Sequence, residues 1–238
     1  MNNNNYIQGF RIDWDLIPNY SYIKNIESIN KIDELIFDSP ITFFAGKNGS
    51  GKSTLLEAIA ESYGFNKEGG SKNYNFSTYD EHSDLTPAIT IYKGYSKATY
   101  NYFFRAETFF NVATKENEYS QTIGRQEHYH EKSHGESFLQ LFKNLCDAKG
   151  IFILDEPEAA LSPEKQLILF SLIYDASKNG SQFIIATHSP ILLGIPDSDI
   201  YLFTNEGINK CTYEETGSYK IISNFINHRE TMVKELTK

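Results

Sequence analysis

Short apolar runs recur along the chain, each bounded by polar or glycine-rich sequence. Residues Ile41–Ala45, Gly150–Leu154 and Gln182–Thr187 form largely apolar runs, and Ile200–Phe203 has the same character. Runs of this length without polar alternation are typical of strands that are buried on both faces of a parallel sheet. The pattern therefore predicts a central sheet assembled from segments that lie far apart in the sequence.

Helical spacing appears between these runs. Apolar positions recur every three to four residues over Leu55–Tyr63. Ser162 and Pro163 are typical of a helix start, the apolar surface of that helix covers Leu167–Tyr174, and Asn179-Gly180 ends it. Strands that alternate with helices predict an α/β fold with a mostly parallel sheet flanked by helices.

The region of about residues 65–132 follows a different pattern. The runs Ala88–Tyr92 and Thr99–Phe103 flank Gly94, so we expect a β-hairpin and a variable lobe that contains antiparallel strands. No heptad pattern is present, which excludes a long coiled coil. Farther along, the tail from Tyr219 to Leu236 is expected to be helical.

Composition indicates how many domains and which cellular compartment to expect. The chain has 238 residues and 40% hydrophobic content, so a single domain over residues 1–238 is expected, with residues 1–8 disordered. Cys146 and Cys211 are too few for a disulfide framework, and no apolar run approaches the ~20 residues of a membrane span. A cytoplasmic location is the expectation.

The net charge of −9 opposes a surface specialised for phosphate backbones. It leaves nucleic acid open as a partner, because a dimer could gather a local basic patch. The candidates lie between residues 65 and 132, and solvated surface positions are the simpler interpretation: Lys67, Lys72, Lys93, Lys97 and Arg105.

A complete phosphate-binding loop occupies residues 46–54, Gly-Lys-Asn-Gly-Ser-Gly-Lys-Ser-Thr. The glycines let successive backbone N–H groups face a phosphate chain, Lys52 supplies charge to the outer phosphates, and the Ser53 hydroxyl can hold Mg²⁺. The motif predicts a Mg²⁺-bound nucleoside triphosphate as the ligand. The expected nucleotide-binding residues are Gly46, Asn48, Gly49, Ser50, Gly51, Lys52, Ser53 and Thr54.

The residues that follow two further predicted strands are candidates for metal binding and catalysis. Asp155 and Glu156 follow the run Gly150–Leu154, as in a Walker B motif, where the aspartate would steady Mg²⁺ and the glutamate would polarise the attacking water. His188 follows the run Gln182–Thr187 and could reach the γ-phosphate. Parallel α/β sheets place their ligand contacts at these carboxyl ends. Lys52, Glu156 and His188 are the expected catalytic residues.

Residues Ser133-His134-Gly135-Glu136 stand 22 residues before Asp155, counted from Ser133, and precede a helix-like stretch. With the motifs above, this string resembles the signature of the ABC ATPase superfamily. The chain is similar to the SMC and RecF-like branch, especially small stand-alone bacterial ATPases. This resemblance covers about residues 22–200 and includes an opening segment, Tyr22–Ile26, which adds Lys24 and Asn25 to the expected nucleotide-binding residues.

The resemblance implies a mechanism. In that family two subunits pair head to tail and clamp each ATP between one P-loop and the other subunit's signature. Ser133 and Gly135 would then contact the γ-phosphate held by the partner, and Glu158–Ser162 would couple the two sites. We therefore expect an ATP-dependent homodimer that transmits its cycle to a partner protein or nucleic acid.

Several positions depart from the family pattern. His134 replaces a signature glycine, and Ser162 replaces the usual aspartate of the coupling loop. Glu107 is the first candidate for the family's Mg²⁺-linked glutamine, with Gln121 and Gln126 as alternatives. The aromatic residues available for adenine stacking are Tyr20, Tyr22 and Trp14.

Other functions fit parts of the sequence. Residues 130–134 spell the His-Glu-x-x-His pattern of zinc proteases, but the preceding stretch lacks the helical periodicity that such a site needs. Incidental metal binding by His128, His130 and His134 is a further alternative, favoured over protease chemistry. Two further functional alternatives are the nucleotide-binding subunit of a transporter and a slowly hydrolysing regulatory switch in a toxin or defence complex.

Overall fold

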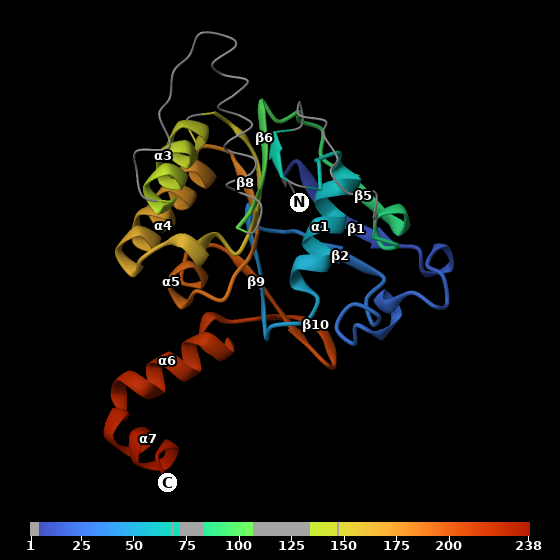
Figure 1. Ribbon diagram of the computed structural model, residues 1–238. Helices are drawn as coiled ribbons and strands as arrows, with labels where there is room; N and C mark the ends of the chain where they lie inside the picture. Colours follow the sequence, from blue (N-terminus) through green and yellow to red (C-terminus); the bar gives the residue numbers. More distant parts are fainter. Residues whose placement is uncertain (1–4, 68, 72–82, 107–133, 147) are drawn as a thin grey trace.

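A mostly parallel sheet runs through the computed structural model, which describes residues 5–67, 69–71, 83–106, 134–146 and 148–238 (Figure 1). Its strands are β10, β9, β3, β8, β7, β6 and β4, in that spatial order. The strands of the chain are β1 (Ile7–Ile12), β2 (Glu34–Ile36), β3 (Ile41–Gly46), β4 (Gly70–Ser71), β5 (Ile89–Lys93), β6 (Tyr100–Arg105), β7 (Gly150–Asp155), β8 (Gln182–Ala186), β9 (Asp199–Thr204) and β10 (Gly207–Cys211). The α-helices are α1 (Lys52–Tyr63), α3 (His134–Cys146), α4 (Pro163–Lys178), α5 (Pro190–Leu193), α6 (Gly217–Asn227) and α7 (Arg229–Leu236).

The five inner strands of this sheet are parallel, whereas the edge strands β10 and β4 pair antiparallel with their neighbours. The predicted α/β class with a mostly parallel central sheet is therefore confirmed. All five parallel strands end at the same edge, so the residues that follow β3, β7 and β8 are brought together there.

Alternate residues of the inner strands face two separate cores. Phe44, Ile153 and Ile184 belong to the core that contains α1 and the N-terminal strands, whereas Phe152 and Phe183 face α3 and α4. The rings of Phe152 and Phe183 stack with centroids 5.1 Å apart. Figure 1 shows the same arrangement, with α3, α4 and α5 on one side of the sheet and α1 on the other. Full burial on both faces explains why these strands read as continuous apolar runs.

The antiparallel lobe is present, but its strands are paired differently from the prediction. β5 pairs with β1, which also pairs with β2, to form a three-stranded antiparallel sheet. β6 instead joins the central sheet beside β7, in register from Tyr100 to Arg105. The predicted hairpin of 88–92 with 99–103 is therefore wrong. Each segment has a strand pattern, but pairing is decided by packing with distant residues that the local pattern does not contain.

The sequence predicts disorder over residues 1–8, whereas residues 5–8 are placed in the fold; residues 1–4 lie outside the described residues. The Asn5 side-chain amide donates to the carbonyls of Phe37 and Ser39, each at 3.0 Å. The Gln182 side chain accepts from the backbone N–H of Ile7 at 2.9 Å and donates to its carbonyl at 2.7 Å. The Gln182 bonds join β1 to β8, and the Asn5 bonds hold the residues before β1 to the segment between β2 and β3. Residues 5–8 are therefore not a frayed end, despite the asparagine-rich composition.

The helix ends follow the expected capping chemistry. Ser162 accepts from the backbone N–H of Lys165 at the start of α4, and Gly64 ends α1 in a left-handed conformation. The helical tail is divided at His228 into α6 and α7. Among the helices of the described residues, none is long and apolar enough to cross a membrane.

Candidate nucleotide-binding site

The P-loop connects β3 to α1, with the helix N-terminus at the carboxyl edge of the sheet. Gly49 and Gly51 have φ angles of 76° and 91°, which disfavour residues with a side chain. A Cβ atom at Gly51 would lie 2.7 Å from Cγ2 of Ile26, so this position also needs glycine for packing. At Gly49 a Cβ would meet nothing within 4 Å. The loop thus packs on one side and leaves the other side open.

A cavity of about 360 Å³ lies on the open side of the loop. It is lined by Tyr22, Ile26, Asn48, Gly49, Gly51, Lys52, Ser53, Thr54 and Glu156. Backbone N–H groups at a helix N-terminus favour anions, and a cavity of this size suits part of a nucleotide. The residues present therefore fit the phosphates of ATP.

Lys52 is almost fully buried, with 4% of its surface exposed. Its ammonium group donates to the carbonyls of Lys47, at 2.9 Å, and Gly46, at 3.3 Å. Burial lowers the pKa of Lys52, and the carboxylates of Glu156, Asp155 and Glu158 oppose that effect. The side chain is therefore held inside the loop by groups that phosphate oxygens could replace.

Ser53 and Asp155 meet at the end of β7. The Ser53 hydroxyl donates to Oδ1 of Asp155 at 2.9 Å, although 102 positions separate the two residues. Magnesium prefers oxygen ligands and usually takes one or two from the protein, with phosphates and water completing the octahedron. The described residues hold no group of three or more His, Cys, Asp or Glu side chains suited to a metal. The hydroxyl and carboxylate pair fits a Mg²⁺ ion that arrives with a triphosphate.

Glu156 and His188 face each other across the carboxyl edge. His188 Nε2 lies 3.6 Å from Oε1 of Glu156. Glu156 adopts a left-handed backbone conformation with φ 49° and ψ 52°, which is uncommon for a residue with a side chain and directs it away from the strand. Burial lowers the pKa of His188, the Lys52 charge lowers it further, and Glu156 and Glu158 oppose this. The net lowering of the pKa favours the neutral imidazole.

Glu158 holds the histidine loop, a role that sequence reasoning did not assign. Its Oε1 accepts from the backbone N–H groups of His188, at 2.6 Å, and Ser189, at 3.1 Å. This carboxylate thus links the segment after β7 to the segment after β8. The sequence did contain a signal for this role, since Glu158 is a third acidic residue close after Asp155 and Glu156.

The predicted nucleotide-binding residues do not all meet at the cavity. Lys24 lies in a 3₁₀ helix, where its ammonium group donates to Oδ1 of Asn19 at 2.8 Å, and neither Lys24 nor Asn25 lines the cavity. Tyr22, from the same short helix, does line it and is 57% exposed. Among the candidates for adenine stacking, Trp14 instead donates from its indole to the Ile32 carbonyl at 3.0 Å.

The signature segment is described only in part. α3 begins at His134, so His134 and Gly135 lie in its first turn, in agreement with the predicted helical signature segment. Ser133 lies outside the described residues, as do Glu107, Gln121, Gln126, His128 and His130. Their expected roles remain predictions.

A buried ion pair lies behind the Mg²⁺ side of the site. Arg105 Nη2 is 2.6 Å from Oε1 of Glu57, and the two side chains are only 13% and 19% exposed. Burial raises the pKa of Glu57, Arg105 lowers it, and Asp155 raises it. Glu57 follows Ser53 by one turn of α1, and Arg105 is in register with Asp155. Arg105 is therefore engaged inside the fold and is not part of an exposed basic patch.

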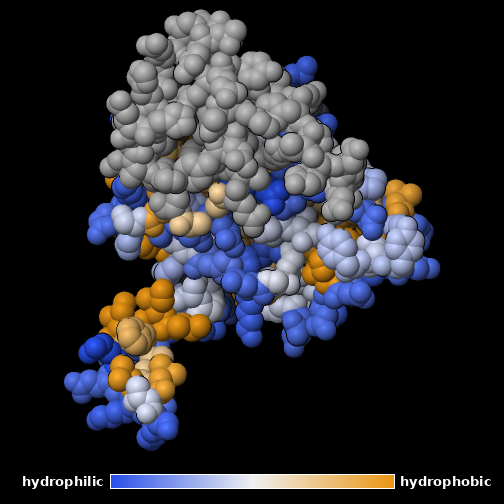
Figure 2. All heavy atoms as spheres, viewed as in Figure 1, coloured by the Kyte–Doolittle hydropathy of each residue, from blue (hydrophilic) through white to orange (hydrophobic). Residues whose placement is uncertain are grey.

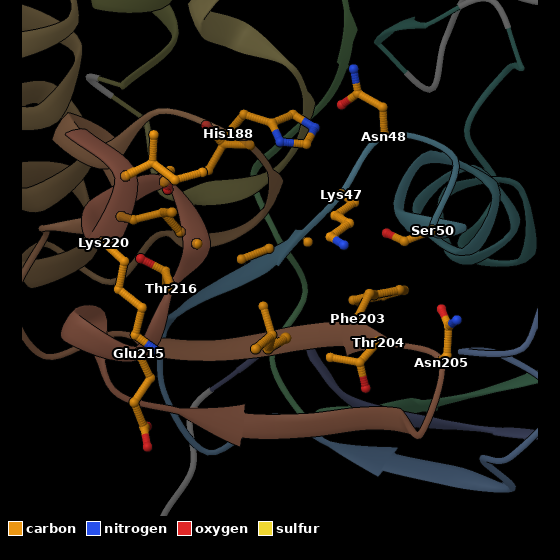
Figure 3. A pocket seen from close by; sticks show the side chains of 18 of the residues that line it. Lys47, Asn48, Ser50, His188, Phe203, Thr204, Asn205, Glu215, Thr216 and Lys220 are labelled. Atoms are coloured by element: carbon orange, nitrogen blue, oxygen red, sulfur yellow. The ribbon is translucent and has the colours of Figure 1, made fainter. Parts of the chain in front are cut away.

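A second cavity, of about 900 Å³, borders the other side of the P-loop. Figure 3 shows His188 on one side of it and Lys47 and Asn48 on the other. Thr216, the N-cap of α6, and Lys220, in its first turn, line the cavity on the same side as His188. The site therefore lies next to the root of the C-terminal helices.

Comparison with known proteins agrees with this geometry. The family model described as "ABC transporter" matches residues 29–159, more than half of the chain. The chain belongs to the ABC transporter family. A second model, described as "AAA domain, putative AbiEii toxin, Type IV TA system", matches residues 138–194.

Relatives of the chain include ATP-binding proteins. The lipoprotein-releasing system ATP-binding protein LolD of Buchnera aphidicola subsp. Schizaphis graminum is 26% identical, over 84% of this chain and 98% of that protein. The energy-coupling factor transporter ATP-binding protein EcfA of Methanosphaera stadtmanae is 23% identical, over 80% of this chain and 75% of that protein. Members of this ABC family hydrolyse ATP, and the chain is an ABC-type ATPase.

Among solved structures, the SMC head domain from Thermotoga maritima aligns with a TM-score of 0.46 and 16% identity, covering 87% of this chain and 99% of that one. An ATP-binding cassette of an ABC transporter in its ADP conformation aligns with a TM-score of 0.42 and 17% identity, covering 87% and 92%.

Proposed function

We propose that this ABC-type ATPase binds Mg-ATP in the P-loop cavity, pairs with a second copy around the nucleotide, and transmits its cycle to a partner protein or nucleic acid. The observation that carries this proposal is the convergence at one sheet edge of groups from three strand ends. Ser53 and Asp155 are hydrogen-bonded, and Glu156 and His188 lie 3.6 Å apart beside them.

Each group has a distinct task in hydrolysis. Mg²⁺ held by Ser53 and Asp155 would neutralise charge on the outer phosphates. Lys52 brings a positive charge to the same oxygens once it leaves the loop carbonyls. Glu156 accepts a hydrogen bond from the attacking water and orients it. The neutral His188 ring donates a hydrogen bond to the γ-phosphate while Glu158 fixes its backbone.

Pairing around ATP is supported by the signature-like string before α3 and by Glu158. Ser133 and Gly135 of one copy would contact the γ-phosphate bound by the other. Because Glu158 belongs to the predicted coupling segment and holds the His188 backbone, movement of that segment by a neighbouring copy would displace His188. A cytoplasmic location agrees with ATP as the substrate and with a sequence that contains only two cysteines, Cys146 and Cys211.

The second candidate function is the ATP-binding subunit of a transporter. It is favoured by the names of LolD and EcfA, which match 84% and 80% of this chain. Such a subunit would hydrolyse ATP only slowly alone and faster with its membrane partner. A regulatory switch in a toxin or defence complex would show slow turnover under both conditions.

The mass of the Glu156→Gln variant in solution, with and without Mg-ATP, tests the proposed pairing. Removal of the carboxylate should slow hydrolysis by roughly 10²–10⁴-fold and trap a dimer when ATP is present. The matched control is Glu156→Gln with Lys52→Ala, which should stay unchanged by ATP. A Glu156→Gln chain that is monomeric without nucleotide and binds ATP without any change in mass would contradict pairing around the nucleotide.

A further inference from the structure

The C-terminal helices α6 and α7 form an arm that projects from the body of the protein (Figure 1). Neither helix contains a buried residue. The arm is nevertheless anchored at its root, where Thr216 is 1% exposed and the Tyr213 hydroxyl donates to the Pro190 carbonyl at 2.9 Å. The tip is therefore exposed while its origin is fixed.

One side of the arm is apolar. Its exposed apolar side chains, here called the arm face, are Ile221, Ile222, Phe225, Ile226, Val233 and Leu236. They recur at helical spacing, and Figure 2 shows apolar side chains gathered over α6 and α7. Their exposure ranges from 39% to 76%. Contiguous exposed apolar area of this kind marks an interaction surface.

The size of the arm face suits a pair of identical surfaces. Taking roughly 150–200 Å² for a large apolar side chain, the arm face exposes on the order of 600 Å² per copy. Two such faces together would bury about 1,200 Å², which is the lower end of specific protein interfaces. The face is at the upper end of the largest apolar patches on ordinary monomers, and it is large enough for a modest dimer.

The charges on α7 are complementary to themselves. Counted outward from Met232, Glu230 mirrors Lys234 and Arg229 mirrors Glu235. In an antiparallel pair of helices related by a twofold axis, mirrored positions lie opposite each other. Every such cross-pair of α7 would join opposite charges. Glu230 and Lys234 also stand four residues apart, so they can interact within one helix, and the experiment below separates the two effects.

We infer that the arm face docks on the arm face of a second copy of this chain, with the two α7 helices antiparallel about Met232 and without any need for nucleotide. This association does not depend on the proposed ATP sandwich. It would hold two ATPase bodies near each other at high local concentration. The first turn of α6 lines the cavity beside His188 and Lys47, so the arm root lies next to the nucleotide site.

The mass of the nucleotide-free chain over about 1–100 μM, by sedimentation velocity, tests this interface. The wild-type chain should form dimers, and Ile226→Glu should weaken them roughly tenfold to hundredfold, because an apolar side chain at the interface becomes charged. Ile226 is 70% exposed, so the fold should survive, and ATP binding should remain. The matched control is Leu167→Glu on α4, where 56% of the side chain is exposed.

Two results would overturn the interface. One is a wild-type chain that stays monomeric over the whole concentration range. A monomer that binds lipid vesicles through Ile226 would count against the interface in the same way. The other is an Ile226→Glu chain that dimerises as strongly as wild type. The ATP-dependent mass of Glu156→Gln is measured separately in the Ile226→Glu background, so failure of the arm and failure of the sandwich are distinguishable.

Mixing charge variants tests the antiparallel register. Glu230→Lys places like charges at positions 230 and 234 of α7, and Lys234→Glu places like charges of the opposite sign there. Each variant alone should dimerise more weakly than wild type. A mixture of the two should recover dimers, because every cross-pair then joins opposite charges. If the mixture shows no recovery, the antiparallel register about Met232 is wrong, since purely intrahelical effects are not relieved by mixing.

Discussion

The carboxyl edge of the central sheet and the C-terminal arm depart from the usual distribution of side chains in opposite ways. At the sheet edge, Lys52 and Asp155 are charged and only 4% and 8% exposed. On the arm, Ile226 and Leu236 are apolar and 70% and 76% exposed. Buried charge and exposed apolar area are the informative exceptions to ordinary burial.

The difference lies in where the compensating groups come from. The fold itself supplies hydrogen bonds to Lys52 and a serine hydroxyl to Asp155, so the sheet edge is pre-organised before its ligand arrives. The described residues bury none of the side chains of the arm face. A ligand completes the first region, whereas only another molecule can complete the second.

The largest effect is expected at the sheet edge. Lys52→Ala should weaken ATP binding at least about a hundredfold, because the buried ammonium group is replaced by a group that cannot pair with phosphate. Lys47→Ala is the matched control, since Lys47 is an exposed lysine of the same loop. Binding of a fluorescent ATP analogue measures both. Undiminished binding by Lys52→Ala would contradict the P-loop assignment.

A smaller effect, on the stability of the fold, is expected when the ion pair behind the site is broken. Arg105→Ala leaves the buried Glu57 carboxylate unpaired and should lower the free energy of unfolding by roughly 2–4 kcal/mol. Lys178→Ala is the control, because its pair with Asp197 is exposed and should contribute far less to stability. Urea denaturation measures both values.

The protonation of Glu57 determines how the stability of the Arg105→Ala variant changes with pH. Burial already raises the pKa of Glu57, and loss of Arg105 removes the larger of the two positive charges that lower it, the other being Lys67. The folded variant then binds more protons than the unfolded chain above the ordinary pKa of glutamate, so its stability falls as pH rises through the raised pKa. The deficit relative to wild type should be larger at pH 8 than at pH 5. Equal deficits at both values would show that Glu57 keeps its charge by other means.

The smallest effect concerns the pKa of His188, measured by NMR titration. Lys52→Met removes a positive charge that lowers this pKa, so the pKa should rise. Glu156→Gln removes a negative charge that raises it, so the pKa should fall. In the wild-type chain the lowered pKa favours the folded state above the ordinary histidine value, and that contribution is lost as pH falls through the lowered pKa. Shifts in the same direction in both variants would contradict the described geometry.

Much of the central sheet could be predicted from the sequence, because its strands are buried on both faces and each is marked by its own apolar run. The P-loop could be predicted equally well, because the local backbone angles, φ 76° at Gly49 and 91° at Gly51, require glycine. The pairing of β5 with β1 could not be predicted. Both β1 and the segment 99–103 have a strand pattern, and the choice between them depends on residues more than 75 positions away. Glu57 and Arg105 were not recognised as a pair for the same reason, as 48 positions separate them.

The sequence by itself determined the local chemistry of this protein: which residues form the phosphate loop, which acids end β7, and which histidine ends β8. These features depend on neighbours within a few residues, where backbone geometry and periodicity act. Only the tertiary structure decided that Glu158 holds the His188 backbone, that Tyr22 and not Lys24 borders the nucleotide cavity, and that the apolar side of α6 faces outward. Those outcomes depend on the packing of distant segments, because a side chain is buried or exposed according to what the rest of the fold places against it.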